Sequence, residues 1–333
     1  MNVHTDAISL DDVDRQVLAA LQVNARASWG QIARTLKMNE STAARRGQRL
    51  FSTGYVRVIG VVDVLRLGIG IPVEVLFDCA PGTAEAVAEA VARHDKVRFV
   101  AVISGRSGCL AELVLKTPDE AMRVIDHELG SIPGVEGTNT MFVLNTFSSA
   151  HDWGRSLLPN TPELLKGLAR PEPTPTHPVG PLTPLEARII NHLEGDGRLA
   201  YATLAEREEI SDMMARRCVE SLYERGILHF RTLIDPALHD YQAGFNVWFD
   251  VEPSSLESTC HTLAEHPDVL YVSVITGTYN IVAQVALHRY QEIYGFLATT
   301  VGGLTGVRRV ESTIELRVLK RAFVRIGTPA DGE

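Results

Sequence analysis

Apolar residues near the start of the chain recur at the spacing of short amphipathic helices. Ile32, Ala33 and Leu36 would share the buried face of one helix, for which Ser28 is a good N-cap. After a short turn, the pattern places a second helix at Asn39–Phe51. Two short helices joined by a tight turn predict a helix-turn-helix, whose second helix would enter the major groove of DNA.

The outward face of this predicted recognition helix is polar and basic. In such motifs the N-terminal half of the helix contacts base edges, and arginines further along or at the flanks contact phosphates. The expected base-contacting residues are Glu40, Ser41, Thr42 and Arg45. The expected backbone-contacting residues are Arg34, Lys37, Arg46, Arg49 and Arg57. The alternative is an ordinary surface pair of helices with a solvated basic face.

The pattern then changes to short apolar strands that alternate with helices. The expected elements are strands at 55–62, 71–79, 97–104, 109–116 and 135–147 and helices at 83–94 and 118–129. From residue 71 the order is β-α-β-β-α-β, which is that of a ferredoxin-like fold. Helices would cover one face of its antiparallel sheet, and a second sheet of the same kind is the natural cover for the other face.

The whole pattern occurs twice, at an offset of 172 residues that separates Gly54 from Gly226 and needs no gap through most of the chain. The segment VAVISG at 100–105, for example, aligns with VSVITG at 272–277. The chain is therefore expected to be a tandem duplication of a unit of about 140 residues. In the second copy the expected elements are strands at 244–251, 270–276, 281–287 and 307–319 and helices at 255–266 and 288–301.

The predicted fold class is α+β, with two tandem copies of a winged or helix-turn-helix head followed by a ferredoxin-like domain. The expected boundaries are 1–62 for the first head, 63–149 for the first ferredoxin-like domain, 150–181 for a linker, 182–234 for the second head and 235–327 for the second ferredoxin-like domain. The linker is rich in proline, so it is expected to be partly stiff, with a short helix at 161–169.

Composition is that of an ordinary globular protein, since 45% of the 333 residues are hydrophobic and 22% are charged. No run of about 18 apolar residues could span a membrane. The polar, acidic N-terminus lacks the features of a signal peptide, so a cytoplasmic protein is expected. Cys79, Cys109, Cys218 and Cys260 form no CxxC pair, which favours buried free thiols over a disulfide framework or a zinc site. The scattered histidines have no metal-ligand spacing, and we expect no metal and no cofactor.

The net charge of −9 is unevenly distributed between the two heads. Residues 10–58 contain eight bases and four acids, a formal charge of +4. Residues 182–230 contain six bases and nine acids, a formal charge of −3. An acidic chain with one basic helical segment is typical of a regulator with a DNA-binding head.

We predict that the first head carries most of the DNA affinity and that the second binds weakly or recognises a different half-site. In the second head Met213 and Met214 replace the polar pair at the start of the recognition helix. Arg216 and Arg217 are its remaining candidates for DNA contact. The alternative is that both heads bind similarly and that charges outside the contact surface account for the difference.

Both copies resemble the Lrp/AsnC family of transcriptional regulators. The resemblance rests on LDDVDRQVLAALQVNARASWGQIARTLKMNESTAARRGQRLFSTGYV at 10–56 and LTPLEARIINHLEGDGRLAYATLAEREEISDMMARRCVESLYERGIL at 182–228. The halves that follow resemble the family's ligand-sensing RAM domain. The resemblance implies a regulator of transcription that binds double-stranded DNA and responds to an amino acid or related metabolite. It also implies oligomers built through the sensing domains, and one chain with two units could form a pseudo-dimer by itself.

The recognition helix departs from the family pattern at one residue. Gly47 stands where the family usually has a valine or isoleucine, as Val219 does in the second copy. A glycine within a helix costs about 1 kcal/mol relative to alanine. We therefore expect either a kink or a neighbour that packs closely against Gly47. Arg46 stands where the family has an arginine, and it can equally pair within the domain.

In the family the effector lies near the loop between the second and third strands of the sensing domain, at the interface of paired sheets. The corresponding residues are Gly105, Arg106, Ser107 and Gly108 in the first copy and Gly277, Thr278, Tyr279 and Asn280 in the second. The family commonly has an aspartate at the fourth loop position, able to hold an α-amino group, whereas this chain has Gly108 and Asn280. Arg106 could instead favour an acidic ligand. The alternative is a plain hairpin turn without a ligand.

Two other functions fit the same order of elements. Siroheme decarboxylases share this two-part unit, but their His-Asn-Tyr run followed by Asn-Met-Trp-Phe has no counterpart at 99–114 or 271–286. No Ser-His-Asp, GxGxxG or P-loop pattern stands out either, so we expect a regulator and not an enzyme. A non-DNA-binding assembly protein is the third alternative.

Overall fold

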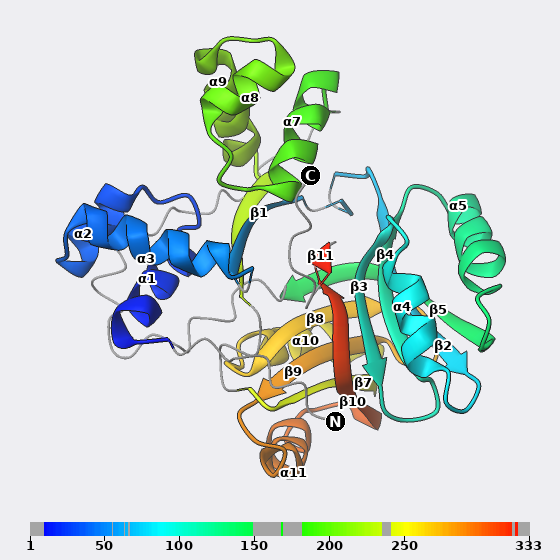
Figure 1. The fold of residues 1–333 in the computed structure, drawn as a ribbon. Coiled ribbons are helices and arrows are strands. Elements are labelled where there is room, and N and C mark those ends of the chain that lie inside the picture. Colours follow the sequence, from blue (N-terminus) through cyan, green and yellow to red (C-terminus); the bar gives the residue numbers. More distant parts are fainter. Residues whose placement is uncertain are drawn as a thin grey trace. The chain divides into compact units, whose positions relative to one another are not determined.

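The computed structural model describes residues 10–54, 56–62, 64–65, 67–148, 168, 182–234, 241–321 and 324–325 (Figure 1). The chain folds into two compact units, each built from two separate segments: 1–63 with 151–239, and 64–150 with 240–333. The first unit therefore contains both heads, and the second contains both ferredoxin-like domains. Apart from one residue, the helix predicted at 161–169 lies outside the described residues.

Each head consists of a helix-turn-helix preceded by one helix and followed by one strand. The first head contains α1 (Asp12–Val23), α2 (Trp29–Leu36), α3 (Glu40–Ser52) and β1 (Val56–Val62). The second head contains α7 (Pro184–Gly195), α8 (Tyr201–Glu208), α9 (Asp212–Glu224) and β6 (Leu228–Ile234). The predicted cap of α2 is confirmed, because the Ser28 hydroxyl accepts a hydrogen bond from the backbone N–H of Gln31. The recognition helix α3 begins and ends one residue later than predicted, since Asn39 is its N-cap.

The first helix of each head begins with the same capping arrangement. The Asp11 carboxylate accepts from the backbone N–H of Asp14, and the Asp14 carboxylate accepts from that of Asp11. Thr183 and Glu186 repeat this exchange at the start of α7. Such a capping box satisfies two backbone donors that the first turn of a helix leaves unpaired. Asp14 and Glu186 are thereby fixed at equivalent positions in the two heads.

Strands β1 and β6 join the two heads in one antiparallel ladder (Figure 1). Their register runs from Val56 opposite Ile234 to Val62 opposite Leu228. The Thr232 hydroxyl on β6 also donates to the backbone carbonyl of Leu21 in α1 (2.7 Å). An isolated two-stranded ribbon is only marginally stable in water. The ladder therefore depends on the helices of both heads, which bury its side chains.

Each ferredoxin-like domain has the predicted β-α-β-β-α-β order, which confirms the α+β class. The first contains β2 (Ile71–Cys79), α4 (Ala84–Ala92), β3 (Val97–Ile103), β4 (Cys109–Leu115), α5 (Pro118–Met122), the π-helical turn η1 (Arg123–Leu129) and β5 (Val135–Ser148). The second contains β7 (Ala243–Val251), the 3-10 turn η4 (Pro253–Ser255), α10 (Leu256–Ala264), β8 (Val269–Ile275), β9 (Ile281–Leu287), α11 (Glu292–Gly295), the π-helical turn η5 (Phe296–Val301), β10 (Val307–Arg321) and β11 (Val324–Arg325). No helix in the described ranges is long and apolar enough to cross a lipid bilayer.

The two ferredoxin-like sheets close into one ring of strands. The order β3-β4-β2-β5 continues directly into β8-β9-β7-β10, and β10 also pairs with β3. Closure depends on the two long strands. The first half of β5 pairs with β2 and its second half with β8, while the first half of β10 pairs with β7 and its second half with β3. Each domain thus completes the sheet of the other.

The inner faces of the two sheets share a buried apolar cluster, as predicted for the face that the helices leave uncovered. Met141, Trp248 and Ile275 contribute to this cluster from strands of both domains. Separate clusters lie under the helices, with Val87 of α4 in the first domain and Leu263 of α10 in the second. The two domains therefore form an internal pair whose cores are joined.

The second helix of each domain differs from the prediction. In place of one α-helix at 118–129, α5 ends at Met122 and continues as the π-helical turn η1. The helix predicted at 288–301 begins only at Glu292 and also continues as a π-helical turn. In the first domain the Thr117 side chain caps the start of α5, whereas α11 has no side-chain cap.

The four cysteines are free thiols in this structure. Cys109 and Cys260 are buried as predicted, whereas Cys79 and Cys218 are only half-buried. Burial raises the pKa of the Cys260 thiol to about 12, which makes it a poor nucleophile at neutral pH. Among the described residues, no group of three or more His, Cys, Asp or Glu side chains is placed to hold a metal ion.

A buried carboxyl group lies between the two ferredoxin-like sheets. Glu74 on β2 is only 4% exposed and stands opposite Glu112 on β4. Glu112 accepts two hydrogen bonds from Arg98, so its own charge is compensated. Burial and the charge of Glu112 raise the pKa of Glu74 to about 8. In the second domain the buried amide of Asn246 occupies the position of Glu74, so a neutral polar group suits this place in the fold.

The raised pKa of Glu74 predicts a pH-dependent effect of Glu74→Gln. The folded protein keeps a proton that the unfolded chain releases above about pH 4, so stability falls as pH rises from there to about 8. Glutamine removes this dependence. The thermal stability of the variant relative to the unaltered protein should therefore rise between pH 5 and pH 8, by at most about 1.4 kcal/mol per pH unit.

Thermal unfolding followed by circular dichroism at several pH values measures this difference. Glu112→Gln is the control, because it leaves Arg98 without its carboxylate and should lower the unfolding temperature throughout. A stability difference for Glu74→Gln that stays constant from pH 5 to pH 8 would contradict the assignment.

Candidate nucleic-acid interface

One face of α3 is exposed along its whole length. Ser41, Arg45, Gln48 and Ser52 are exposed and follow one another at i, i+4, i+7 and i+11, which is the spacing of a single helix face. The opposite face carries Leu50, which is buried in the core of the first head. Gln48 was not among the predicted contacts. Its spacing from Ser41 is the signal that would have identified it.

Three exposed basic residues flank or join this face. Arg34 lies in the last turn of α2, Lys37 in the turn that follows, and Arg45 on α3. Lys37 has left-handed backbone geometry (φ 55°), which ends α2 and redirects the chain into α3. Within the described part of the chain, none of the three forms an ion pair. No carboxylate of the described residues neutralises these three charges in an ion pair.

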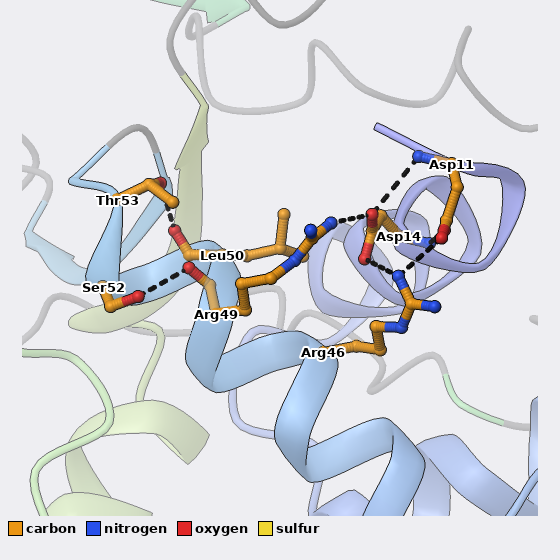
Figure 2. Close-up of polar contacts among 7 residues, drawn as sticks. All are labelled: Asp11, Asp14, Arg46, Arg49, Leu50, Ser52 and Thr53. Carbon is orange, nitrogen blue, oxygen red and sulfur yellow. Dashed lines mark hydrogen bonds and ion pairs between the residues drawn. The ribbon is translucent and has the colours of Figure 1, made fainter. Parts of the chain in front are cut away.

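Arg46 and Arg49 bind acidic residues at the start of the first head (Figure 2). Arg46 donates to Asp11 (Nη1–Oδ2 2.5 Å) and to Asp14 (Nη1–Oδ1 3.1 Å), and Arg49 donates to the other oxygen of Asp14. Asp14 is fully buried, so its carboxylate would be strongly destabilised without these partners. The pairing foreseen for Arg46 within the domain is thus present. Contact of Arg46 and Arg49 with DNA stays a prediction.

The other predicted contacts of the first head are Glu40, Thr42 and Arg57. Glu40 is the first residue of α3, and its carboxylate lies beside Gly30 in the first turn of α2. Negative charge is favoured there by the helix dipole, which gives Glu40 a structural role as well. Thr42 on α3 and Arg57 on β1 are both half-buried.

The Trp29 ring lies directly against α3 at Gly47. A Cβ atom at position 47 would lie 2.0 Å from Cη2 of Trp29, which is closer than any real contact. Of the two explanations predicted for this glycine, the closely packed neighbour is confirmed. At the equivalent positions the second head has Tyr201 and Val219. The second head thus has a smaller aromatic residue and a larger aliphatic residue at these two positions.

The second head carries acidic residues where the first has exposed basic residues. Glu206 and Glu209 occupy the positions of Arg34 and Lys37, and both are exposed. A carboxylate repels a phosphate at the distance where a guanidinium or ammonium attracts it. Two of the three basic groups around the exposed face of the first head are thus reversed in sign in the second.

The recognition helix of the second head, α9, has two exposed apolar side chains in its first turn. Met213 is 80% exposed and Met214 is 52% exposed. Arg216 and Arg217 follow on α9 and are exposed as expected for contacts. Arg217 aligns with Arg45, so the two heads offer a matched pair of arginines on otherwise different surfaces.

The buried acid of the second head has a different partner from that of the first. Glu186 occupies the position of Asp14, but Cys218 stands where the first head has Arg46. Glu186 instead accepts a hydrogen bond from Arg225, at the end of α9. The internal ion pair is therefore kept, although its arginine lies at the end of the recognition helix and not at the position of Arg46.

The predicted effector loops lie where the two ferredoxin-like domains meet. Beside the first loop, the Ser104 N–H donates to the carbonyl of Ile314 on β10 (2.8 Å). Beside the second, the Thr276 N–H donates to the carbonyl of Phe142 on β5 (2.9 Å). Each loop is thus held against the long strand of the other domain, which is the place that the resemblance implied.

The fourth position of each loop offers no carboxylate to a ligand. A Cβ atom at Gly108 would lie 2.7 Å from that of Ala84 and 3.0 Å from that of Cys79, so an aspartate would require movement. The Asn280 side chain binds both backbone groups of Val251 (3.0 and 2.7 Å). An α-amino group therefore lacks the partner that it commonly finds in the family.

The remaining loop residues present charges that differ between the copies. In the first loop the Ser107 hydroxyl donates to Asp78 (2.6 Å), and Arg106 is 89% exposed. In the second loop the Tyr279 hydroxyl donates to Glu311 (2.7 Å). The loops turn at Gly105 and Gly277, whose φ angles of 104° and 118° favour glycine, and Thr278 is exposed.

Fold and site together define a helix-turn-helix protein with a duplicated ferredoxin-like domain. Residues 10–50 match the AsnC-type helix-turn-helix domain, and residues 73–152 and 245–324 each match the Lrp/AsnC ligand binding domain. These matches together cover more than half of the chain. The chain therefore belongs to the Lrp/AsnC family.

Similar proteins include single-unit regulators from archaea. An uncharacterized HTH-type transcriptional regulator of Pyrococcus furiosus is 29% identical over 146 residues, which are 44% of this chain and 99% of that protein. The HTH-type transcriptional regulator FL11 of Pyrococcus abyssi is 30% identical over 140 residues, or 42% of this chain and 92% of that protein. Each relative thus corresponds to about one of the two copies.

The crystal structure of the siroheme decarboxylase NirDL resembles the whole chain in fold. It covers 92% of this chain and 92% of its own, with a TM-score of 0.64 and 16% sequence identity. At this identity the likeness shows a shared fold alone. The two-copy architecture is therefore found in at least one other protein chain.

The contact of Trp29 with Gly47 predicts a compensating pair of substitutions. Gly47→Val alone should destabilise the first head by about 2 kcal/mol, because its side chain would overlap the Trp29 ring. Trp29→Tyr with Gly47→Val recreates the pair of the second head and should recover most of this loss. Chemical denaturation of the two single variants and the double variant measures the coupling, and strictly additive effects would refute it.

Proposed function

We propose that this chain is a sequence-specific DNA-binding transcription regulator in which the first head carries most of the DNA affinity. One observation carries the proposal. The exposed face of α3 is flanked by Arg34 and Lys37, carries Arg45, and lacks neutralising carboxylates within the described residues. A recognition-helix face suits a DNA groove when it is polar and carries basic side chains that are not engaged in ion pairs among the described residues. Base edges need polar partners, and phosphates need cations.

The division of work along this surface follows from where its residues lie. Ser41, Arg45 and Gln48 share the outward face of α3 and are the proposed contacts to base edges. Arg34 and Lys37, at the end of α2 and in the turn, are the proposed contacts to phosphates. Each phosphate contact releases condensed counterions, so binding should weaken steeply as salt is raised.

The second head is proposed to add little DNA affinity through DNA contacts of its own. It retains Arg217 at the position of Arg45, but Glu206 and Glu209 oppose the approach of phosphates. Met213 and Met214 replace two hydroxyl groups with side chains that have no strong hydrogen-bond donor or acceptor. The pairing of the heads through β1 and β6 holds this second head in place whether or not it touches DNA.

We also propose that further copies of this chain assemble through the ferredoxin-like domains. A small metabolite is proposed to bind at the paired loops of these domains. The loops support this because each lies on the long strand of the other domain. Arg106 is the exposed group suited to a carboxylate, whereas the fourth positions offer no partner for an α-amino group. A thermal-shift screen of amino acids and of carboxylic acids without an amine separates the two ligand classes.

A gel shift with the DNA upstream of the protein's own gene tests the main proposal. Retardation of that DNA, but not of unrelated DNA of equal length, is the expected result. Absence of retardation together with binding of an iron tetrapyrrole would instead favour the decarboxylase alternative. If neither DNA retardation nor tetrapyrrole binding is observed, the result favours the third alternative, a non-DNA-binding assembly protein.

A matched pair of variants tests the unequal heads. Arg45→Ala should lower operator affinity by about 1–3 kcal/mol, which is the range for an arginine that contacts a base. Arg217→Ala, at the equivalent exposed position on α9, should change it much less. Fluorescence anisotropy of labelled operator DNA at several salt concentrations measures both. Equal losses from the two variants would rule out a dominant first head.

A further inference from the structure

Arg198 belongs to the second head, yet its side chain lies in the first. It follows α7, and its guanidinium donates to the backbone carbonyls of Ala25 (2.7 Å) and Ala27 (3.0 Å). Both alanines lie between α1 and α2 and are buried. The fork of an arginine suits this task, because it can donate to two acceptors at once.

The same guanidinium lies over two aromatic rings of the first head. Its central carbon is 4.6 Å from the ring centre of Trp29 and 5.9 Å from that of Phe51. Trp29 begins α2, and Phe51 lies near the end of α3, so one cation contacts both helices of the helix-turn-helix. Burial, with the nearby charge of Arg26, lowers the pKa of Arg198 to about 10, which keeps it cationic at neutral pH.

These contacts reach the DNA-facing helix through Trp29. The Trp29 ring lies so close to α3 that only glycine fits at position 47. Gly47 follows Arg45 by two residues and precedes Gln48. A change in the position of the Trp29 ring therefore shifts or loosens the segment of α3 that carries the proposed base contacts.

Arg26 makes similar contacts from the first head to the second, although its two rings lie on α8 and β6. It donates to the carbonyls of Gly197 (2.9 Å) and Leu199 (3.2 Å). Its guanidinium lies 4.8 Å from the ring centres of both Tyr201 and Phe230. The two arginines thus cross between the heads in opposite directions, with nearly the same number and kind of contacts.

We propose that Arg198 is a positioning residue for DNA recognition, through which the second head holds the recognition helix of the first. The second head then contributes to operator affinity without touching the operator. Arg26 contacts α8 and β6 of the second head, on which little DNA affinity is proposed to depend. This inference rests on the proposed function, in which the first head is the principal DNA-binding surface.

Arg198→Ala and Arg26→Ala, in the full-length chain, form a matched test. Both remove one crossing arginine, so both should lower the thermal unfolding temperature to a similar extent. Operator affinity should fall about tenfold or more for Arg198→Ala, in line with the loss of two charged hydrogen bonds and a cation–π contact. It should change by less than about threefold for Arg26→Ala, within the spread expected of contacts remote from DNA. Arg198→Lys, which keeps the charge but not the fork, should lie between Arg198→Ala and the unaltered protein.

Affinity is measured by anisotropy at a temperature where circular dichroism shows all variants folded. Amide hydrogen exchange without DNA supplies the second readout, which also serves if a variant folds poorly. Exchange in the α3 segment should accelerate several-fold in Arg198→Ala and not in Arg26→Ala, which should instead accelerate exchange in α8 and β6. Equal affinity losses, or unchanged α3 exchange in Arg198→Ala, would overturn the inference. If the unaltered protein bound no operator, the proposed function would fail, and exchange would still decide whether Arg198 holds α3.

Discussion

The crossing of Arg26 and Arg198 between the heads is the interaction on which the first unit depends. Removing a guanidinium from water is costly unless its donors are bonded. Each of these half-buried side chains contacts two carbonyl oxygens and two aromatic faces in the opposite head. The antiparallel ladder of β1 and β6 sets the distance between the heads at which both arginines reach their partners.

The second unit is built on the same principle by different means. Strands β5 and β10 are each shared between two sheets, so either domain alone would leave half of a long strand without hydrogen-bond partners. Both units are therefore internal pairs whose halves complete each other. A single chain thus contains the head-to-head and domain-to-domain contacts that two chains would otherwise have to form.

Local and periodic signals made much of this fold predictable from sequence. The cap at Ser28, the apolar spacing of α2 and α3, and the ungapped offset of 172 residues led directly to two copies of a helix-turn-helix and a ferredoxin-like domain. The candidate interface was only partly predictable. Charge on α3 could be counted, but the binding of Arg46 and Arg49 to Asp14 joins residues more than 30 apart in sequence, and no spacing rule specifies it. Contacts that cross between the copies were out of reach for the same reason.

The two heads show which differences a duplicated fold tolerates. Inside the heads two substitutions are each matched by another: Tyr201 with Val219 replaces Trp29 with Gly47, and Arg225 takes over the neutralisation of a buried acid. Such positions are coupled, because an unmatched change leaves a clash or an unpaired charge. On the surface no such coupling exists, and exchanging an exposed base for an acid usually alters stability by less than about 0.5 kcal/mol. In a symmetric dimer of identical chains, that exchange would remove phosphate contacts from both heads at once. In one chain with two copies it removes them from one head only, so the altered head can lose DNA contact and still provide the strand and the arginine that the other head needs.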